Sequence, residues 1–255
     1  MGNLPHISEN EQGDKTLYVG GKPYIALGGE LHNSSASSLE YMEEEVWPYL
    51  KDIPLDTVLL PVYWENIEPI EDQFDFTLLD DLVKQARREG VKLILLWFGL
   101  WKNGQSSYVP GWVKEDYQRF FRSCYKIGHP SETISPFCQE AVTADAKAFS
   151  RLMKHLWEVD EEENTIIMVQ VENEIGFLGA ERDFSPAAEK AYSEEVPAII
   201  ESLYNCTGSW EDALGEDAAE IFMAYYYALA VEEIAAQGKA NYPLPMYVNA
   251  WLEQF

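Results

Sequence analysis

Apolar runs alternate with amphipathic stretches along most of the chain, and this pattern predicts β-strands separated by helices. Five short apolar runs are bounded by polar or turn-forming residues, as expected of strands that are covered on both faces. The predicted strands are Tyr24–Leu31, Thr57–Tyr63, Val91–Phe98, Thr165–Glu172 and Pro245–Trp251. Continuous apolar strands of this kind are typical of parallel sheets flanked by helices.

The segments between the strands carry helical periodicity. The clearest is Thr77–Glu89, in which apolar residues recur at helical spacing, acids precede bases, and Gly90 ends the helix. Further helices are predicted over residues 39–50 (capped by Ser37 or Ser38), 140–157, 186–203 and 217–237. A loop-rich insertion at 99–139 follows the third strand, and loops of that length usually carry function.

Strands alternating with helices predict an α/β fold. Two architectures fit: an open doubly wound sheet, or a (β/α)8 TIM-type barrel of which about five of the eight βα units are present. Gly28-Gly29-Glu30 after the first strand lacks the spacing of a phosphate-binding loop, which disfavours a nucleotide-binding sheet. Because no linker-like tract interrupts the pattern, we expect a single domain over residues 1–255.

Composition narrows the expected partners and location. The 18 Lys and Arg residues against 44 Asp and Glu give a formal charge of -26, which argues against nucleic acid or an anionic membrane as partner. The three cysteines form no disulfide framework or zinc-binding spacing, so no metal or cofactor is expected. Residues 1–15 lack the apolar core of a secretory signal, which predicts a cytoplasmic protein as written. If the start is an engineered replacement of a removed signal, the protein is secreted or periplasmic instead.

The most informative segment is the fourth strand, which ends in Glu172-Asn173-Glu174. In barrels of parallel strands the catalytic groups lie just past the carboxyl ends of the strands. A partly desolvated carboxylic acid there can have a raised pKa and donate a proton, which is the role expected of Glu174. Asn173 can bond a sugar hydroxyl. Strand alternation sends Glu172 to the opposite side, so a helix cap or a buried pair explains it at least as well as catalysis.

The ends of three other predicted strands carry polar and aromatic residues that should converge on the same face. These candidates are Glu30, His32, Trp64, Glu68, Trp101, Lys102 and Asn103. Flat aromatic faces can stack on sugar CH groups while carboxylates and amides hold hydroxyls, so the set predicts a carbohydrate-binding site. His32 is better explained as a structural hydrogen-bonding residue near a strand end, and Lys102 is explained equally well as the partner of one of the many carboxylates.

With these residues assembled, the chain resembles glycoside hydrolase family 35, in the clan of (β/α)8 retaining glycosidases. The matching segments are Gly28–His32, Trp64 with Glu68-Pro69, Phe74–Phe76, Pro110-x-Trp112 and Val169–Gly176. The last is similar to the acid/base motif of the family. Segments 29–35 and 96–104 resemble the bacterial branch whose members carry a further carboxy-terminal domain.

This resemblance implies a β-galactosidase that releases terminal non-reducing β-linked galactose from oligosaccharides or plant-polysaccharide side chains with retained configuration. Retention needs a nucleophilic carboxylate about 5 Å from the acid. The family supplies it from the seventh strand, so with five strands we expect it beyond Phe255, and Glu253 is a poor substitute by position. The expected partners are a carbohydrate and either the remainder of the barrel or a second copy of the chain.

Two alternatives remain. One is a carbohydrate-binding or assembly subunit without activity alone. The other is a retaining β-glycosidase of another family in the same clan.

Overall fold

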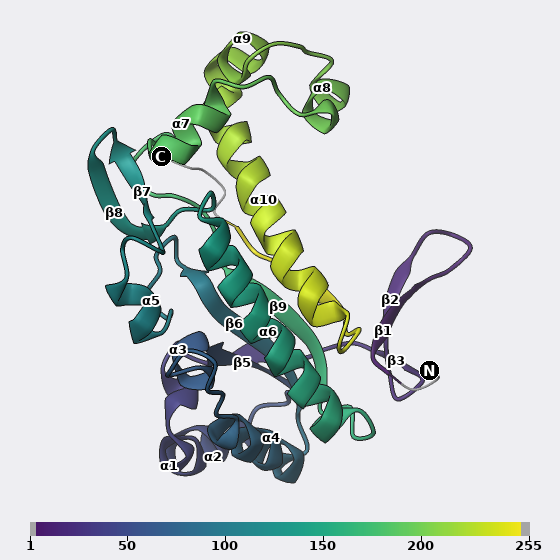
Figure 1. The fold of residues 1–255 in the computed structure, drawn as a ribbon. Coiled ribbons are helices and arrows are strands. Elements are labelled where there is room, and N and C mark those ends of the chain that lie inside the picture. Colours follow the sequence, from purple (N-terminus) through teal and green to yellow (C-terminus); the bar gives the residue numbers. More distant parts are fainter. Residues whose placement is uncertain (1–3, 251–255) are drawn as a thin grey trace.

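The computed structural model describes residues 4–250 and contains a parallel sheet of five strands in the order β10-β9-β6-β5-β4 (Figure 1). The strands are β4 (Gly28–Glu30), β5 (Thr57–Tyr63), β6 (Lys92–Lys102), β9 (Ile166–Asn173) and β10 (Met246–Tyr247). Spatial order follows chain order throughout, as in a (β/α) barrel, whereas the strand order of a doubly wound sheet reverses. The predicted α/β fold of incomplete barrel type is confirmed.

Three long helices cover one face of this sheet. They are α4 (Thr77–Glu89), α6 (Gln139–Asp160) and α10 (Ala218–Lys239), and α6 and α10 pack side by side (Figure 1). The main apolar core lies between the helices and outward-facing strand residues such as Val58, Leu95 and Val169. The predicted strand β5 and helix α4 match their observed bounds.

The first predicted strand is divided in two. Residues 22–24 form β3, which joins β1 (His6–Glu9) and β2 (Lys15–Val19) in a separate antiparallel sheet, and only Gly28–Glu30 enters the parallel sheet. Between them the chain crosses over at Leu27, whose N–H donates to Asp56 Oδ1 at 2.9 Å. That contact takes residues 25–27 out of both ladders.

Prolines divide two predicted helices. Residues 39–50 form α1 (Leu39–Tyr41), a π-helical turn η2 (Met42–Val46) and α2 (Trp47–Leu50), because Pro48 cannot donate to the preceding turn. Ser38 is the predicted cap and accepts from Tyr41 N at 3.2 Å. Residues 186–203 form two helices, α7 (Pro186–Tyr192) and α8 (Ala198–Tyr204), since Pro197 precedes the second.

The remaining elements are short and lie mostly near the carboxyl ends of the strands. They are η1 (Ser35–Ser37), α3 (Trp64–Ile67), α5 (Gly111–Glu115), β7 (Arg122–Lys126), β8 (His129–Ile134), α9 (Trp210–Leu214) and η3 (Gly215–Asp217). The insertion after β6 is thus a helix and a β-hairpin. Figure 1 shows β7, β8 and α7 together at the end where β6 and β9 finish.

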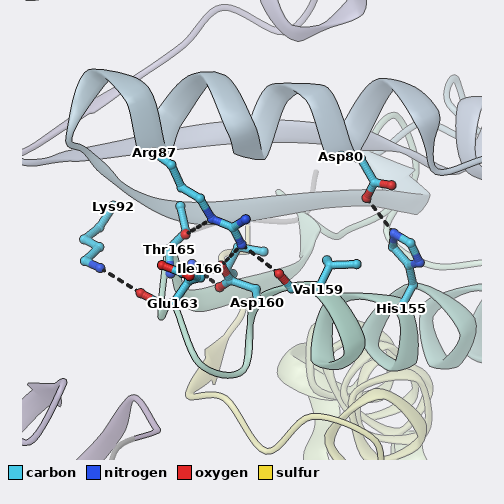
Figure 2. Close-up of polar contacts among 9 residues, drawn as sticks. All are labelled: Asp80, Arg87, Lys92, His155, Val159, Asp160, Glu163, Thr165 and Ile166. Carbon is cyan, nitrogen blue, oxygen red and sulfur yellow. Dashed lines mark hydrogen bonds and ion pairs between the residues drawn. The ribbon is translucent and has the colours of Figure 1, made fainter.

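The opposite end is held together by an ion pair whose carboxylate is buried (Figure 2). Arg87 on α4 reaches Asp160 at the end of α6, with Nη2 2.6 Å from Oδ1. The same carboxylate accepts from Thr165 N at 3.1 Å and Ile166 N at 2.7 Å. Arg87 also donates to Val159 O at 2.8 Å. The network connects α4 and α6 to the first residues of β9 and so fixes the start of that strand.

Candidate active site

The carboxyl ends of β6 and β9 lie side by side, and both are rich in polar residues. Lys102 is in register with Asn173. Asn103 N donates to Asn173 O at 3.1 Å, and Gly104 N donates to Glu174 O at 3.0 Å. The backbone itself therefore places two predicted sugar-binding residues beside the predicted acid.

The side chains of this cluster are hydrogen-bonded to one another. Lys102 Nζ donates to Asn103 Oδ1, and Asn173 Nδ2 donates to the same oxygen at 3.3 Å. Gln170, further back on β9, donates to Asn173 Oδ1 at 2.9 Å. Turning the Asn173 amide over lets its oxygen accept from Lys102 Nζ at 2.9 Å and from Glu174 N at 3.2 Å. In either orientation Asn173 is held by its neighbours.

Lys102 brings a positive charge into an otherwise acidic molecule. Lys102 is buried, and this burial lowers the pKa of its ammonium group. The carboxylates of Glu174 and Glu30 act in the opposite direction, because they favour the charged form. Glu30 ends β4 and Glu174 follows β9, so these two carboxylates come from strands on either side of β6. An ammonium with few water contacts is well suited to hold a substrate oxygen.

Glu174 leaves β9 in an unusual backbone conformation. Its φ is 48°, and Glu172 and Asn103 also have positive φ, at 63° and 55°. Such angles are uncommon for residues other than glycine, and they collect at functional sites where a side chain must be aimed. Glu174 N is held by Asn249 Oδ1 at 2.7 Å, and the residue is half-buried.

Glu30 and His32 lie at the exposed rim. They belong to an open pocket of about 480 Å³ whose lining is Glu30, Leu31, His32, Asn33 and Ser34. The hydroxyl of Tyr63, at the end of β5, donates to Asn33 O and ties this rim to the neighbouring strand. Both predicted residues therefore face solvent beside the carboxyl ends of the strands.

Trp64, Glu68 and Trp101 do not lie at this surface. All three are buried, with at most 1% of their surface exposed. Trp64 Nε1 donates to Glu68 Oε2 at 2.9 Å, and Trp101 Nε1 donates to Ile134 O at 2.9 Å. Burial raises the pKa of Glu68, and its two hydrogen bonds partly oppose this. Their polar side-chain atoms are used within the protein, and their role as substrate contacts stays a prediction.

Glu172 points away from Asn173, as expected from the sequence, although its φ of 63° interrupts the alternation, since Asn173 contacts Gln170 three residues earlier. It is completely buried and forms a hydrogen-bonded pair with Asp145 of α6. Among the roles that the sequence allowed for Glu172, the structure shows the buried pair.

Two supporting residues escaped the sequence reasoning. Asn249 follows β10 directly, and the rule that chemistry collects at strand ends could have found it. Gln170 lies inside an apolar strand, and only the structure shows that it contacts Asn173. Glu253, the alternative nucleophile, lies outside the described residues.

Residues 4–250 contain neither a candidate membrane-spanning helix nor a candidate metal-binding cluster. No helix in that range is long and apolar enough to cross a membrane. Across the same part of the chain, no group of three or more His, Cys, Asp or Glu side chains is arranged to hold a metal ion.

The sheet order and the acid–amide cluster at the strand ends define a barrel of the glycosidase type. The sequence model of glycosyl hydrolases family 35 matches residues 16–249, and the chain belongs to that family. A β-galactosidase from Xanthomonas manihotis is 28% identical over 163 residues, which cover 61% of this chain and 24% of that protein.

Solved structures show the same fold. The β-galactosidase from Bacillus circulans sp. alkalophilus superposes with a TM-score of 0.64 at 17% identity, covering 88% of this chain and 36% of that one. The cold-adapted β-galactosidase from Rahnella sp. R3 gives a TM-score of 0.62 at 15% identity, with the same coverage. The chain thus spans about a quarter of the curated relative and about a third of the solved chains.

Proposed function

We propose that residues 1–255 form the amino-terminal part of one barrel domain of a retaining β-galactosidase-type glycoside hydrolase. In this proposal Glu174 is the general acid and base, and its substrate is a terminal non-reducing β-linked galactose on an oligosaccharide or plant polysaccharide. The supporting observation is that Glu174 leaves β9 half-buried beside Asn173 and the Lys102 ammonium. Membership of family 35 supports the same reaction class over glycosidases of other families in the clan.

Each neighbour of Glu174 has a proposed task. Asn173 binds a sugar hydroxyl whose hydrogen bond tightens in the transition state. Lys102 and Asn103, joined by their own hydrogen bond, hold substrate oxygens from the β6 side. Glu30 and His32 form the rim over the end of β4, where an exposed sugar would first make contact. Trp64, Glu68 and Trp101 support this surface from below.

The second carboxylate of a retaining mechanism is proposed to come from polypeptide beyond these five strands. Within residues 4–250, β10 pairs only with β9, which leaves its outer edge available to a further strand. Beside it lies a cavity of about 880 Å³ between α10 and the sheet, lined by apolar residues such as Ala228, Val231 and Met246. An apolar surface of this kind beside an open strand edge suits the remainder of a barrel.

The test is hydrolysis of an aryl β-galactoside by the longest polypeptide that the reading frame encodes, beside residues 1–255 alone. We expect the long form to turn over with retention, seen by NMR of the first-formed sugar, and residues 1–255 alone to be inactive. Glu174→Gln should greatly lower turnover of substrates whose leaving group needs protonation. Glu216→Gln, at an exposed position on η3, is the matched control and should not affect it.

Two results would contradict the proposal. Turnover by residues 1–255 alone would place the nucleophile within them. Sugar binding by the long form without any turnover would favour the alternative of a carbohydrate-binding or assembly subunit.

A further inference from the structure

Two acidic side chains meet in the core behind the proposed site. Asp145 projects from α6 and Glu172 from β9, both are completely buried, and they hydrogen-bond each other. No step of the proposed reaction uses either group. Buried carboxyls are costly, so a pair retained here needs an explanation.

The hydrogen bonds of the pair all go to one short stretch of β6. Trp97 Nε1 donates to Asp145 Oδ1 at 2.8 Å, and Trp101 N donates to Glu172 Oε2 at 2.7 Å. Leu100 N donates to both groups, to Asp145 Oδ2 at 2.7 Å and Glu172 Oε1 at 3.1 Å. Since one N–H is shared by an oxygen from each group, those two oxygens are neighbours. Two charged oxygens this close in a dry interior would repel strongly, and a proton between them removes that repulsion.

The backbone is shaped to admit the pair. A Cβ atom on Gly99 would lie 2.2 Å from Asp145 Oδ2 and 2.5 Å from Glu172 Oε1. No other residue type fits there without moving the carboxyl groups. Both Asp145 oxygens accept short bonds, at 2.8 and 2.7 Å, whereas Glu172 Oε1 accepts only the longer bond from Leu100 N at 3.1 Å, so that oxygen is the one best placed to carry the proton. Burial raises the pKa of both carboxyl groups.

We propose that Asp145 and Glu172 share a single proton, carried by Glu172, and act as a positioning pair for the proposed catalytic acid Glu174. The pair clamps the backbone of residues 99–101 to the strand that carries Glu174, immediately before Lys102 pairs with that strand. It thereby fixes the distance and angle between the two halves of the site. This inference rests on the proposed function for its catalytic consequence, though not for the shared proton.

The arrangement of donors predicts opposite outcomes for the two amide variants. In Glu172→Gln, the new NH2 can donate to Asp145 Oδ2 while the amide oxygen accepts from Trp101 N. In Asp145→Asn, the new NH2 must face either the Trp97 indole N–H or the Leu100 N–H, and both are donors. Glutamine at 172 displaces only the longer bond from Leu100 N and therefore mimics the protonated acid, whereas asparagine at 145 displaces either the bond from Trp97 Nε1 or the shorter bond from Leu100 N.

The first experiment detects the proton directly, in the long polypeptide and without substrate. Infrared difference spectra at neutral pH should show the carbonyl stretch of a protonated carboxylic acid that disappears in Glu172→Gln and persists in Glu216→Gln. If the band survives in Glu172→Gln, the assignment of the proton is wrong. This arm stands even if the protein hydrolyses no galactoside.

The second experiment measures positioning. Glu172→Leu keeps the volume but removes both acceptors, and we expect kcat to fall roughly 100-fold, as for a small misplacement of a catalytic group, with KM changed far less. Glu172→Gln should restore kcat to within a few-fold of wild type, and Asp145→Asn should be the more damaging amide variant. Unchanged kcat in Glu172→Leu, no rescue by glutamine, or a better tolerated Asp145→Asn would each overturn the proposal. If Glu172→Leu does not fold, the comparison of the two amide variants still decides it.

A galactoside assay that shows no activity in the wild-type long form, together with an infrared band lost in Glu172→Gln, would contradict the proposed function alone. An active wild-type long form, together with an infrared band that survives in Glu172→Gln, would contradict the positioning pair alone.

Discussion

Lys102 and Asn173 face each other in register at the last paired position of β6 and β9. The register shifts between Trp97 and Lys102, so β6 reaches this pairing only after an irregular stretch. That stretch is the one whose N–H groups are taken by Asp145 and Glu172. The buried carboxyl pair and the proposed catalytic cluster are thus two parts of one local structure.

Lys102→Met is expected to weaken substrate binding and turnover. The substitution keeps the length of the buried stem but removes the ammonium that donates to Asn103 and lies near Glu174 and Glu30. Loss of a hydrogen bond from a charged group costs about 1.5–3 kcal/mol, so kcat/KM for an aryl galactoside should fall by about 10- to 100-fold.

The control for this variant is Lys114→Met on α5, which removes a half-exposed ion pair with Glu65 of α3. Such pairs contribute little, so its kcat/KM should stay close to wild type. Equal losses in both variants would argue against a special role for Lys102.

Gly99→Ala is expected to destabilise the fold by about 3 kcal/mol or more, because the added methyl group overlaps both carboxyl groups of the buried pair. Gly111→Ala is the matched control, since a Cβ atom there meets nothing within 4 Å. Urea unfolding of both variants measures the difference. A small change for Gly99→Ala would mean that the carboxyl pair moves aside at little cost.

The pH dependence of stability should identify Glu172. Its pKa is raised in the folded protein, chiefly by burial and then by Asp145, from an ordinary value of 4.5. The folded state therefore keeps a proton that the unfolded state releases, and the free energy of unfolding contributed by this group falls as the pH rises above 4.5. Glu172→Gln removes that slope, so denaturation curves over a pH series should be flatter than wild type above this point. An unchanged slope would contradict the raised pKa.

Asp160→Ala should destabilise the protein without affecting catalysis below its melting temperature. It removes the carboxylate partner of Arg87, which keeps its bond to Val159 O, and leaves two backbone N–H groups without their acceptor at the end of the strands opposite the site (Figure 2), at a cost of about 3 kcal/mol. Asp81→Ala, which breaks a surface pair with Lys84, should change the stability far less, because solvent screens the pair. Thermal unfolding and kcat measured on the same samples test both statements.

Much of the fold could be predicted from sequence because its strands are continuous apolar runs and its best helix carries clear end signals. β5 and α4 are correct to the residue. The failures are at positions where tertiary contacts outweigh local pattern. Asp56 draws residues 25–27 out of the first strand, and prolines at 48 and 197 interrupt runs whose apolar periodicity continues through them.

The candidate site was predictable to the extent that strand ends are. Glu174, Asn173, Lys102 and Asn103 come together because β6 and β9 are neighbours in register. Trp101 precedes Lys102 directly yet lies in the core. Position at a strand end does not determine which way a side chain turns, and that depends on partners such as Ile134 from a distant hairpin.

The most direct test of Glu174 as the proton donor is how its loss depends on the leaving group. In the long polypeptide, kcat/KM of Glu174→Gln should fall by about 10²- to 10⁴-fold for a β-galactoside with an alkyl leaving group, which needs protonation. It should fall far less for a dinitrophenyl galactoside, whose leaving group departs unprotonated. Equal losses on both substrates, or no loss on either, would contradict the assignment of Glu174 as the acid.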